Sequence, residues 1–314
     1  MTSPTALSGI FPITPTPFNP DGSLDPEGQR RVLDCMIDQG VDGICILANY
    51  SEQFLLSDEG RELLMTLCLD HVAGRVPVIV TCSHFSTDIS CARVKRAEAA
   101  GAAMVMMMPP YHGALLRADD TGVYEHFARL AEAISIPIMI QDAPLSRVTL
   151  SVPLLARIAH DLPTVSYFKI ETPGTAAKLR ALLAAAGESI AGPFDGEEGI
   201  TLLADLVAGA TGTMTSELMS ELIRPIVIDH LAGRREAAAA GYARVLPLIN
   251  YENRQCGLRA TKTAMMEGGG DQERHRAPPA DPARPGDPCR AAAACRGPRP
   301  PGAALGQVLS LIHI

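Results

Sequence analysis

The sequence predicts a (β/α)8 TIM barrel with appended C-terminal helices. Eight short apolar segments alternate with eight amphipathic stretches, over about 225 residues. Each apolar segment is hydrophobic at nearly every position, as expected for parallel strands that are covered on both faces. An open doubly wound sheet is the structural alternative, but it usually has fewer units, and no glycine-rich phosphate loop follows the first apolar segment.

The expected elements follow one another in strict alternation. The apolar runs, such as "GICILAN", "VPVIVTCS" and "IPIMIQDA", predict strands at residues 9–18, 43–49, 76–83, 102–109, 136–143, 165–171, 189–195 and 211–216. The amphipathic stretches between and after them predict helices at residues 26–39, 57–72, 87–100, 119–134, 152–161, 174–187, 197–208 and 217–232. We therefore assign residues 1–233 to the barrel.

Two segments follow the barrel. Residues 234–267 predict two or three further helices, which form a helical extension. Residues 268–314 carry eight of the 25 prolines without hydrophobic periodicity, so this tail is expected to be disordered. Its composition also resembles GC-rich DNA translated out of frame. A frameshift is therefore a second hypothesis for the tail, and an intact frame on resequencing the gene would refute it.

Composition narrows the classes of function. The chain has 314 residues, is 47% hydrophobic and has a formal net charge of −8, which gives no reason to expect nucleic acid as a partner. The first residues lack a secretory pattern and no apolar run is long enough for a membrane helix, so we expect a cytoplasmic protein without a membrane partner. The eight cysteines form no CxxC pair, which favours reduced thiols over the alternative of a metal site.

Polar side chains gather where the expected strands end, which is where barrel enzymes bind their substrates. The candidates are Asn49, Tyr50, Ser51, Glu52, Tyr111, His112, Gln141, Lys169, Asp195 and Ser216.

Lys169 is unusual among them. The chain has only four lysines, and this one alone lies in an expected strand, between Phe168 and Ile170. Burial would lower the pKa of its amine and make it nucleophilic, as Schiff-base formation with a ketone requires. The alternative is a buried ion pair with Glu171 or Asp142.

The order of these motifs resembles the dihydrodipicolinate synthase and N-acetylneuraminate lyase superfamily over residues 6–267. "YFKIE" matches the segment whose lysine binds a 2-keto acid, which gives Lys169 that role. "ANYSE" falls on the loop that binds the carboxylate of the keto acid, with only Glu52 retained, and "GPFDGEE" resembles the segment after strand 7. The resemblance implies substrate-binding roles for Asn49, Tyr50, Ser51, Glu52, Asp195 and Ser216, and it implies a homotetramer.

Gln141 is the main departure from that resemblance. Synthases and lyases of the superfamily carry a proton-shuttling tyrosine there, and glutamine cannot act as an acid or base near neutral pH. Together with "ANYSE", the segment "QDAPLS" resembles the dehydratase branch.

This branch implies a Schiff-base hydro-lyase that converts L-2-keto-3-deoxyarabonate to 2-oxoglutarate semialdehyde in pentose catabolism. No metal or organic cofactor is expected, because the imine supplies the activation. Gln141 would position the leaving hydroxyl, and Tyr111 or His112 would move protons, although the sequence does not identify the proton carrier. The alternatives are a 2-keto-3-deoxy sugar acid aldolase that releases pyruvate and a non-catalytic barrel that binds keto acids.

Overall fold

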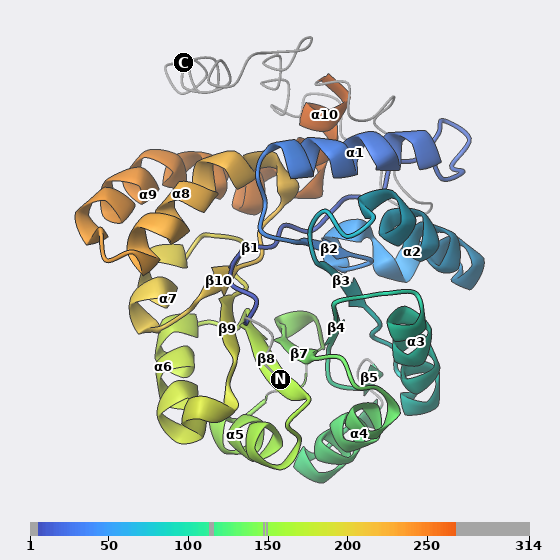
Figure 1. Ribbon diagram of the computed structural model, residues 1–314, viewed down its shortest axis with the longest axis vertical. Coiled ribbons are helices and arrows are strands. Elements are labelled where there is room, and N and C mark those ends of the chain that lie inside the picture. Colours follow the sequence, from blue (N-terminus) through green and yellow to red (C-terminus); the bar gives the residue numbers. More distant parts are fainter. Residues whose placement is uncertain (1–5, 113–115, 147, 149, 268–314) are drawn as a thin grey trace.

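The structure is a computed structural model that describes residues 6–112, 116–146, 148 and 150–267. The expected tail at 268–314 lies outside the described residues. Within them the chain forms a barrel surrounded by helices, which Figure 1 shows end on, so the predicted fold class is confirmed.

Eight parallel strands form one sheet in the order β1-β10-β9-β8-β7-β4-β3-β2. An isolated parallel bridge between Ile13, just after β1, and Cys45 of β2 connects the two ends of the sheet and closes the barrel. The first strand is much shorter than predicted, because Pro12, Pro15 and Pro17 cannot donate ladder hydrogen bonds. The strands are β1 (Gly9–Ile10), β2 (Ile44–Ile46), β3 (Val78–Thr81), β4 (Met104–Met107), β7 (Ile138–Asp142), β8 (Val165–Ile170), β9 (Gly192–Asp195) and β10 (Gly212–Thr213).

Helices cover the outer face of the sheet. They are α1 (Pro26–Asp38), α2 (Asp58–Val72), α3 (Thr87–Ala99), α4 (Asp120–Ala133), α5 (Val152–Asp161), α6 (Thr175–Ala186), α7 (Leu202–Ala208) and α8 (Ser220–Leu231). The first five begin directly after a side chain that caps the helix by accepting a backbone N–H, namely Asp25, Ser57, Ser86, Asp119 and Ser151.

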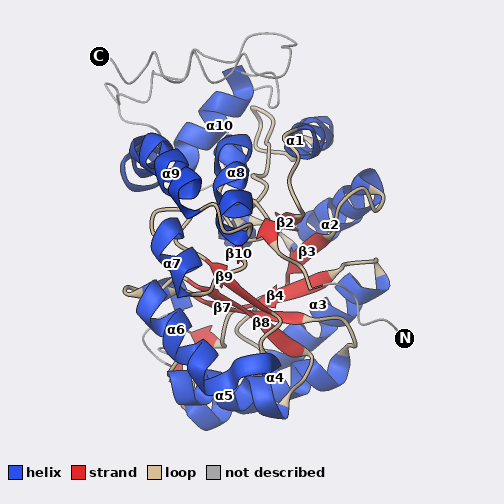
Figure 2. Cartoon of the chain, turned by 60° about the vertical axis from the view of Figure 1, so that its left-hand side comes forward, coloured by secondary structure: helices blue, strands red, loops and turns tan. Residues whose placement is uncertain are grey.

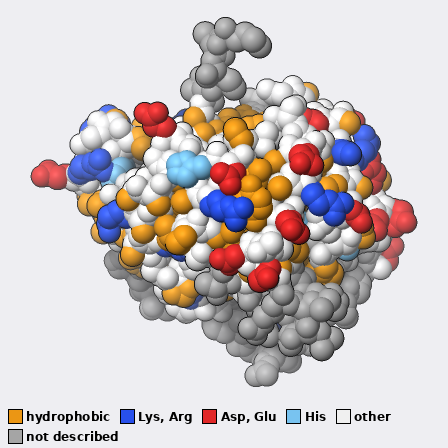
Figure 3. Space-filling view, turned by 90° about the horizontal axis from the view of Figure 1, so that it is seen from below, with side chains coloured by type: hydrophobic (Ala, Val, Ile, Leu, Met, Phe, Trp, Pro, Cys, Tyr) orange, Lys and Arg blue, Asp and Glu red, His pale blue; other side chains and the backbone are white. Residues whose placement is uncertain are grey.

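Three helical segments follow the barrel: α9 (Arg235–Asn250), the π-helix η6 (Tyr251–Cys256) and α10 (Leu258–Glu267). Figure 2 shows α8, α9 and α10 together at one side of the barrel. None of the helices in the described part of the chain is both long and apolar enough to cross a bilayer. On the face shown in Figure 3, acidic, basic and apolar side chains are interspersed.

Alternating side chains divide the interior into two cores. The outer core, between sheet and helices, includes Phe168 and Ile170. The inner core fills the barrel and includes Tyr167 from the same strand, together with Cys45 and Met139. This period of two determines which polar residues at the strand ends can reach the barrel mouth.

Candidate active site

The amine of Lys169 lies inside the barrel mouth. It follows Tyr167 on the inward face of β8, and its side chain is buried. Its Nζ atom lies 2.6 Å from Oε1 of Glu171. Gln141, the neighbour of Lys169 in the sheet register, donates its side-chain N–H to the same oxygen over 2.7 Å. The three side chains thus form one hydrogen-bonded group around the amine.

The charge state of Lys169 differs from the sequence-based expectation. Burial acts to lower the pKa of the amine, but the charge and hydrogen bond of Glu171 outweigh it, so the pKa is raised above its ordinary value. The prediction of a lowered pKa is therefore wrong, because it did not include a carboxylate at hydrogen-bonding distance. At rest the amine is held as an ammonium group.

Asp142, the other partner considered for Lys169, faces the opposite way. Its carboxylate lies 2.5 Å from Nζ of Lys178 on α6, on the helix side of the sheet. Burial raises the pKa of Asp142, although the Lys178 hydrogen bond opposes that shift. Glu171 is therefore the partner of Lys169 and Asp142 is not.

The loop after β2 carries four of the predicted substrate-binding residues. Asn49 and Tyr50 lie in the short helical turn η1 (Asn49–Ser51) and are half-buried. Oδ1 of Asn49 accepts a hydrogen bond from Gln53 over 2.7 Å. The hydroxyl of Ser51 is buried and donates to the carbonyl of Thr14 over 2.6 Å, so it braces the loop.

Glu52 ends this turn in the left-handed conformation, at φ 57°. Its carboxylate forms a buried ion pair with Lys262 of α10, whose Nζ also lies 4.7 Å from the ring centroid of Phe18. The pair ties the predicted carboxylate-binding loop to the helical extension, so the structure gives Glu52 an anchoring contact.

Asp195 is fully buried, and its contacts are with the protein itself. Its Oδ2 accepts from the hydroxyl of Thr213 over 2.5 Å and from the backbone N–H of Gly199 over 3.2 Å. Its Oδ1 accepts from the backbone N–H of Glu197 over 3.2 Å. These bonds hold the turn that follows β9, and a role for Asp195 in binding substrate hydroxyls stays a prediction.

Glu198 lies on that turn, and sequence reasoning missed it. The predicted helix at 197–208 included this residue, whereas α7 begins at Leu202 and Glu198 adopts a left-handed conformation at φ 58°. Tyr50 donates its hydroxyl toward Oε2 of Glu198 over 3.4 Å and to Oδ1 of Asn253 over 2.9 Å. The glycines on either side of the "EE" pair, directly after a strand, were the signal of a turn.

Ser216 lies just after the last strand, β10, and is buried beside Glu252 of η6. Burial raises the pKa of Glu252, while its contacts with Ser216 and Thr261 act in the opposite direction. Burial also raises the pKa of Glu217 well above its ordinary value. A role for Ser216 in binding a distal substrate hydroxyl stays a prediction.

Tyr111 and His112 form strand β5 (Tyr111–His112), which pairs with β6 (Leu116–Arg117) in an antiparallel hairpin. Their side chains lie outside the described part of the structure, so their predicted roles in proton transfer stay predictions.

Comparisons with known proteins show the family of the chain. The model of the dihydrodipicolinate synthetase family matches residues 6–285. The chain belongs to this family. It is 54% identical over 277 residues to the L-2-keto-3-deoxyarabonate dehydratase of Azospirillum brasilense, covering 87% of this chain and 90% of the relative.

Other members are more distant in sequence. The 4-hydroxy-tetrahydrodipicolinate synthase of Bacillus velezensis is 27% identical over 258 residues, covering 82% of this chain and 87% of the relative. The crystal structure of the dihydrodipicolinate synthase of Rhodopseudomonas palustris superposes with a TM-score of 0.80 at 26% identity, covering 97% of this chain and 96% of that one. Gln141 stands where the resemblance implied a tyrosine, and in this chain it donates its amide N–H to Glu171.

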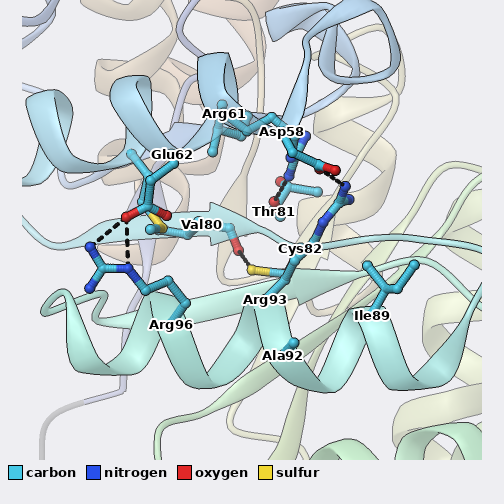
Figure 4. A pocket seen from close by; sticks show the side chains of 12 residues that line it. Asp58, Arg61, Glu62, Val80, Thr81, Cys82, Ile89, Ala92, Arg93 and Arg96 are labelled. Atoms are coloured by element: carbon cyan, nitrogen blue, oxygen red, sulfur yellow. Dashed lines mark hydrogen bonds and ion pairs between the residues drawn. The ribbon is translucent and has the colours of Figure 1, made fainter.

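A cavity of about 310 Å³ lies outside the barrel, between α2 and α3 (Figure 4). Val80 and Cys82, which line it, belong to the outer core, so the cavity is separate from Lys169. Arg61 crosses it and donates to the carbonyls of Gln53 and Thr81 over 3.3 and 2.8 Å. The guanidinium of Arg61 therefore holds Gln53, the residue that follows Glu52, in place.

Proposed function

We propose that this chain is a Schiff-base-forming hydro-lyase that dehydrates L-2-keto-3-deoxyarabonate to 2-oxoglutarate semialdehyde. One observation carries the proposal. A buried lysine amine beside a carboxylate, Lys169 with Glu171, occupies the barrel mouth of a chain that is 54% identical to a relative named for this dehydration.

The first step is condensation of Lys169 with the substrate. Its Nζ atom passes one proton to Glu171 and adds to the C2 ketone, and a second N–H proton moves to the ketone oxygen. Glu171 returns the first proton to that oxygen, which leaves as water, and a protonated imine remains. Glu171 lies 2.6 Å from the nitrogen and offsets its positive charge, while Gln141 keeps that carboxylate in place. Asn49, whose Oδ1 is bonded to Gln53, would donate its amide N–H to the substrate carboxylate.

The imine then makes the proton on C3 acidic, because it accepts the electron pair of the C3–H bond. The electron pair returns to form the C3–C4 double bond as the C4 hydroxyl leaves with a proton as water. A proton shift from C5 to C3 gives an enol, which becomes the aldehyde. Hydrolysis of the imine then releases the product and the lysine amine.

Product identification from one substrate tests this function. With L-2-keto-3-deoxyarabonate we expect 2-oxoglutarate semialdehyde, whereas an aldolase would release pyruvate. Borohydride reduction in the presence of pyruvate, followed by peptide mass analysis, should locate an adduct on Lys169. The K169A variant should lose both signals, while K95A, which removes an exposed lysine from α3, should keep them. An unmodified Lys169 in the wild-type protein would refute the proposal.

We also propose that the enzyme acts in the cytoplasm as a homotetramer, which its family resemblance supports. Light scattering after size-exclusion chromatography tests the assembly, and a monomer that is fully active would refute it.

A further inference from the structure

The π-helix η6 places three consecutive polar side chains next to the barrel mouth. Glu252 is buried, Asn253 bonds to the hydroxyl of Tyr50, and Arg254 forms an ion pair with Glu197 on the turn after β9. π-Helices are rare and frequently lie at functional sites. The reaction proposed above gives these three side chains no task, and Asn253 is the one that bonds to a predicted substrate-binding residue.

The hydrogen bonds of Asn253 determine which way its amide group faces. Its Nδ2 atom donates to the carbonyl of Ile249 over 3.2 Å and to the carbonyl of Glu198 over 3.4 Å. A backbone carbonyl can only accept a hydrogen bond, so the amide nitrogen must lie on this side. Oδ1 is therefore left for the hydroxyl of Tyr50, which lies 2.9 Å away. An amide oxygen can only accept, so Tyr50 is the donor in this bond.

Tyr50 has a single hydroxyl proton to give. Burial raises the pKa of this hydroxyl well above its ordinary value, and the carboxyl groups of Glu198, Glu252 and Glu217 act in the same direction. The hydroxyl therefore keeps its proton near neutral pH. Two acceptors compete for that proton, Oδ1 of Asn253 at 2.9 Å and Oε2 of Glu198 at 3.4 Å. The shorter distance assigns the proton to Asn253.

The direction of this proton affects the neighbouring carboxyl group. With its proton turned toward Asn253, Tyr50 presents only the lone pairs of its oxygen to Glu198. An ionised Glu198 then receives no hydrogen bond from the tyrosine, whereas a protonated Glu198 can donate one to it. A hydrogen bond made by the neutral form of a carboxyl group favours that form. Asn253 can therefore act on the Glu198 carboxyl group through Tyr50.

We propose that Asn253 is a positioning residue that holds the proton of the Tyr50 hydroxyl away from Glu198, so that Tyr50 offers this carboxyl group an acceptor and not a donor. The inference rests on the proposed function, in which the keto acid joins Lys169 at the same barrel mouth. It gives the helical extension a part in setting the charge at the site, although Asn253 and Tyr50 are 203 positions apart in the chain.

The other groups that act on Glu198 come from β8, from the residue that follows it and from η6. Burial raises the pKa of Glu198 to about 7. Lys169 and Arg254 act to lower that pKa, whereas Glu171 and Glu252 raise it further. The charge of Glu198 acts in turn on Lys169 and raises the pKa of the amine. The protonation of Glu198 should therefore appear in the pH dependence of adduct formation at Lys169.

Trapping of the pyruvate adduct with cyanoborohydride across pH tests the role of Asn253. The inflection that belongs to Glu198 is the one near pH 7 that E198Q removes. In N253L the Tyr50 proton is free to turn to the Glu198 carboxylate, so this inflection should move to lower pH by about one pH unit. N253A should shift it in the same direction, which covers the case that leucine prevents folding. N253D keeps an acceptor for Tyr50 and adds a negative charge, so its inflection should move to higher pH.

Opposite shifts in N253L and N253D separate a directed proton from a loss of packing, which would move both variants alike. Adding N253L to Y50F should leave the inflection where Y50F has it, because Asn253 then has no hydroxyl to hold. The matched control is N250L, the same change at an exposed amide at the end of α9, which should leave the profile unchanged.

Three results would overturn the role of Asn253 and leave the proposed function intact. They are an unchanged inflection in N253L and N253A, an equal shift when N253L is added to Y50F, and a wild-type profile from which E198Q removes no inflection. A wild-type protein that forms no adduct at Lys169 would overturn both the proposed function and this inference.

Discussion

The ammonium group of Lys169 and the carboxylate of Glu171 form a buried pair whose charge must be redistributed before the amine can attack a ketone. The amine has to give up a proton, yet the imine that follows is again positively charged. In the proposed reaction Glu171, 2.6 Å away, would therefore stabilise both the resting enzyme and the imine intermediate. The reactivity of Lys169 would thus depend on proton exchange with neighbouring groups more than on a permanently neutral amine.

Replacing Glu171 separates these two effects. In E171Q burial would still lower the pKa of Lys169 without the opposing carboxylate, so adduct formation with pyruvate should reach half its maximum at a lower pH than in wild type. Dehydration should slow by about 10²-fold, because the imine loses its counter-charge. Borohydride trapping across pH measures the first effect. E188Q, at an exposed glutamate, is the control, and an unchanged midpoint in E171Q would contradict the prediction.

Gly196 offers a steric test of the same site. In G196A the added methyl group would meet Glu171, Lys169 and the carbonyl of Ile170 at 2.5–2.9 Å, so these groups must shift. We expect kcat/KM to fall by about 10²-fold with the fold retained. G122A, where the nearest atom lies at 3.4 Å, should leave kcat/KM unchanged. Near-native circular dichroism with full activity in G196A would count against this geometry.

At the scale of elements, the sequence predicted most helices well and the active-site turn poorly. Helix starts such as those of α1 and α2 are marked by capping side chains, Asp25 and Ser57, which are local signals. Strand alternation is local too, but the contacts of polar residues at the strand ends depend on register, so the hydrogen bonds of Asp195 with Thr213 and Gly199 were not predicted. Glu198 depends on hydrogen bonds from Asp195 that no periodicity reveals.

The contact between α10 and the loop after β2 yields an element-scale prediction. K262M would leave Glu52 buried without its cation, which should lower the free energy of unfolding by about 3–5 kcal/mol. Adding E52Q should recover most of that loss, because the uncompensated charge is then gone. Urea unfolding measures both variants, and KM for the keto acid should rise in K262M. Equal stability of the single and double variants would refute a charge-based anchor.

For the molecule as a whole, several buried carboxyl groups have raised pKa values. Burial raises the pKa of Glu217 and Glu252, and it raises that of Asp205 to about 8. Each group therefore contributes its full stabilisation of the fold when the pH is below the pKa that the group has in the unfolded chain. That contribution is lost as the pH rises through the higher pKa that the group has in the folded protein. We therefore expect the fold to lose stability at alkaline pH, because these buried carboxyl groups ionise there.

Glu217 provides the clearest case, because it is fully buried. In E217Q the amide cannot ionise, so Tm should exceed that of wild type at pH 8, and the difference should shrink at pH 5, where the wild-type side chain is protonated. Thermal unfolding at the two pH values measures this. E221Q, at an exposed position on the following helix, should show no such dependence. A larger difference at pH 5 would reverse the sign and contradict the assignment.

The ion pair between Glu52 and Lys262 also has a consequence for biosynthesis. The two residues are separated by 210 positions, so the loop that would receive the substrate is translated early and acquires its anchor only when α10 emerges. A chain that stopped before Lys262 would contain Lys169, Glu171 and Glu198 and yet carry a binding loop with an unneutralised buried acid. We therefore expect such truncated products to be less stable and to bind the keto acid more weakly than the full described chain.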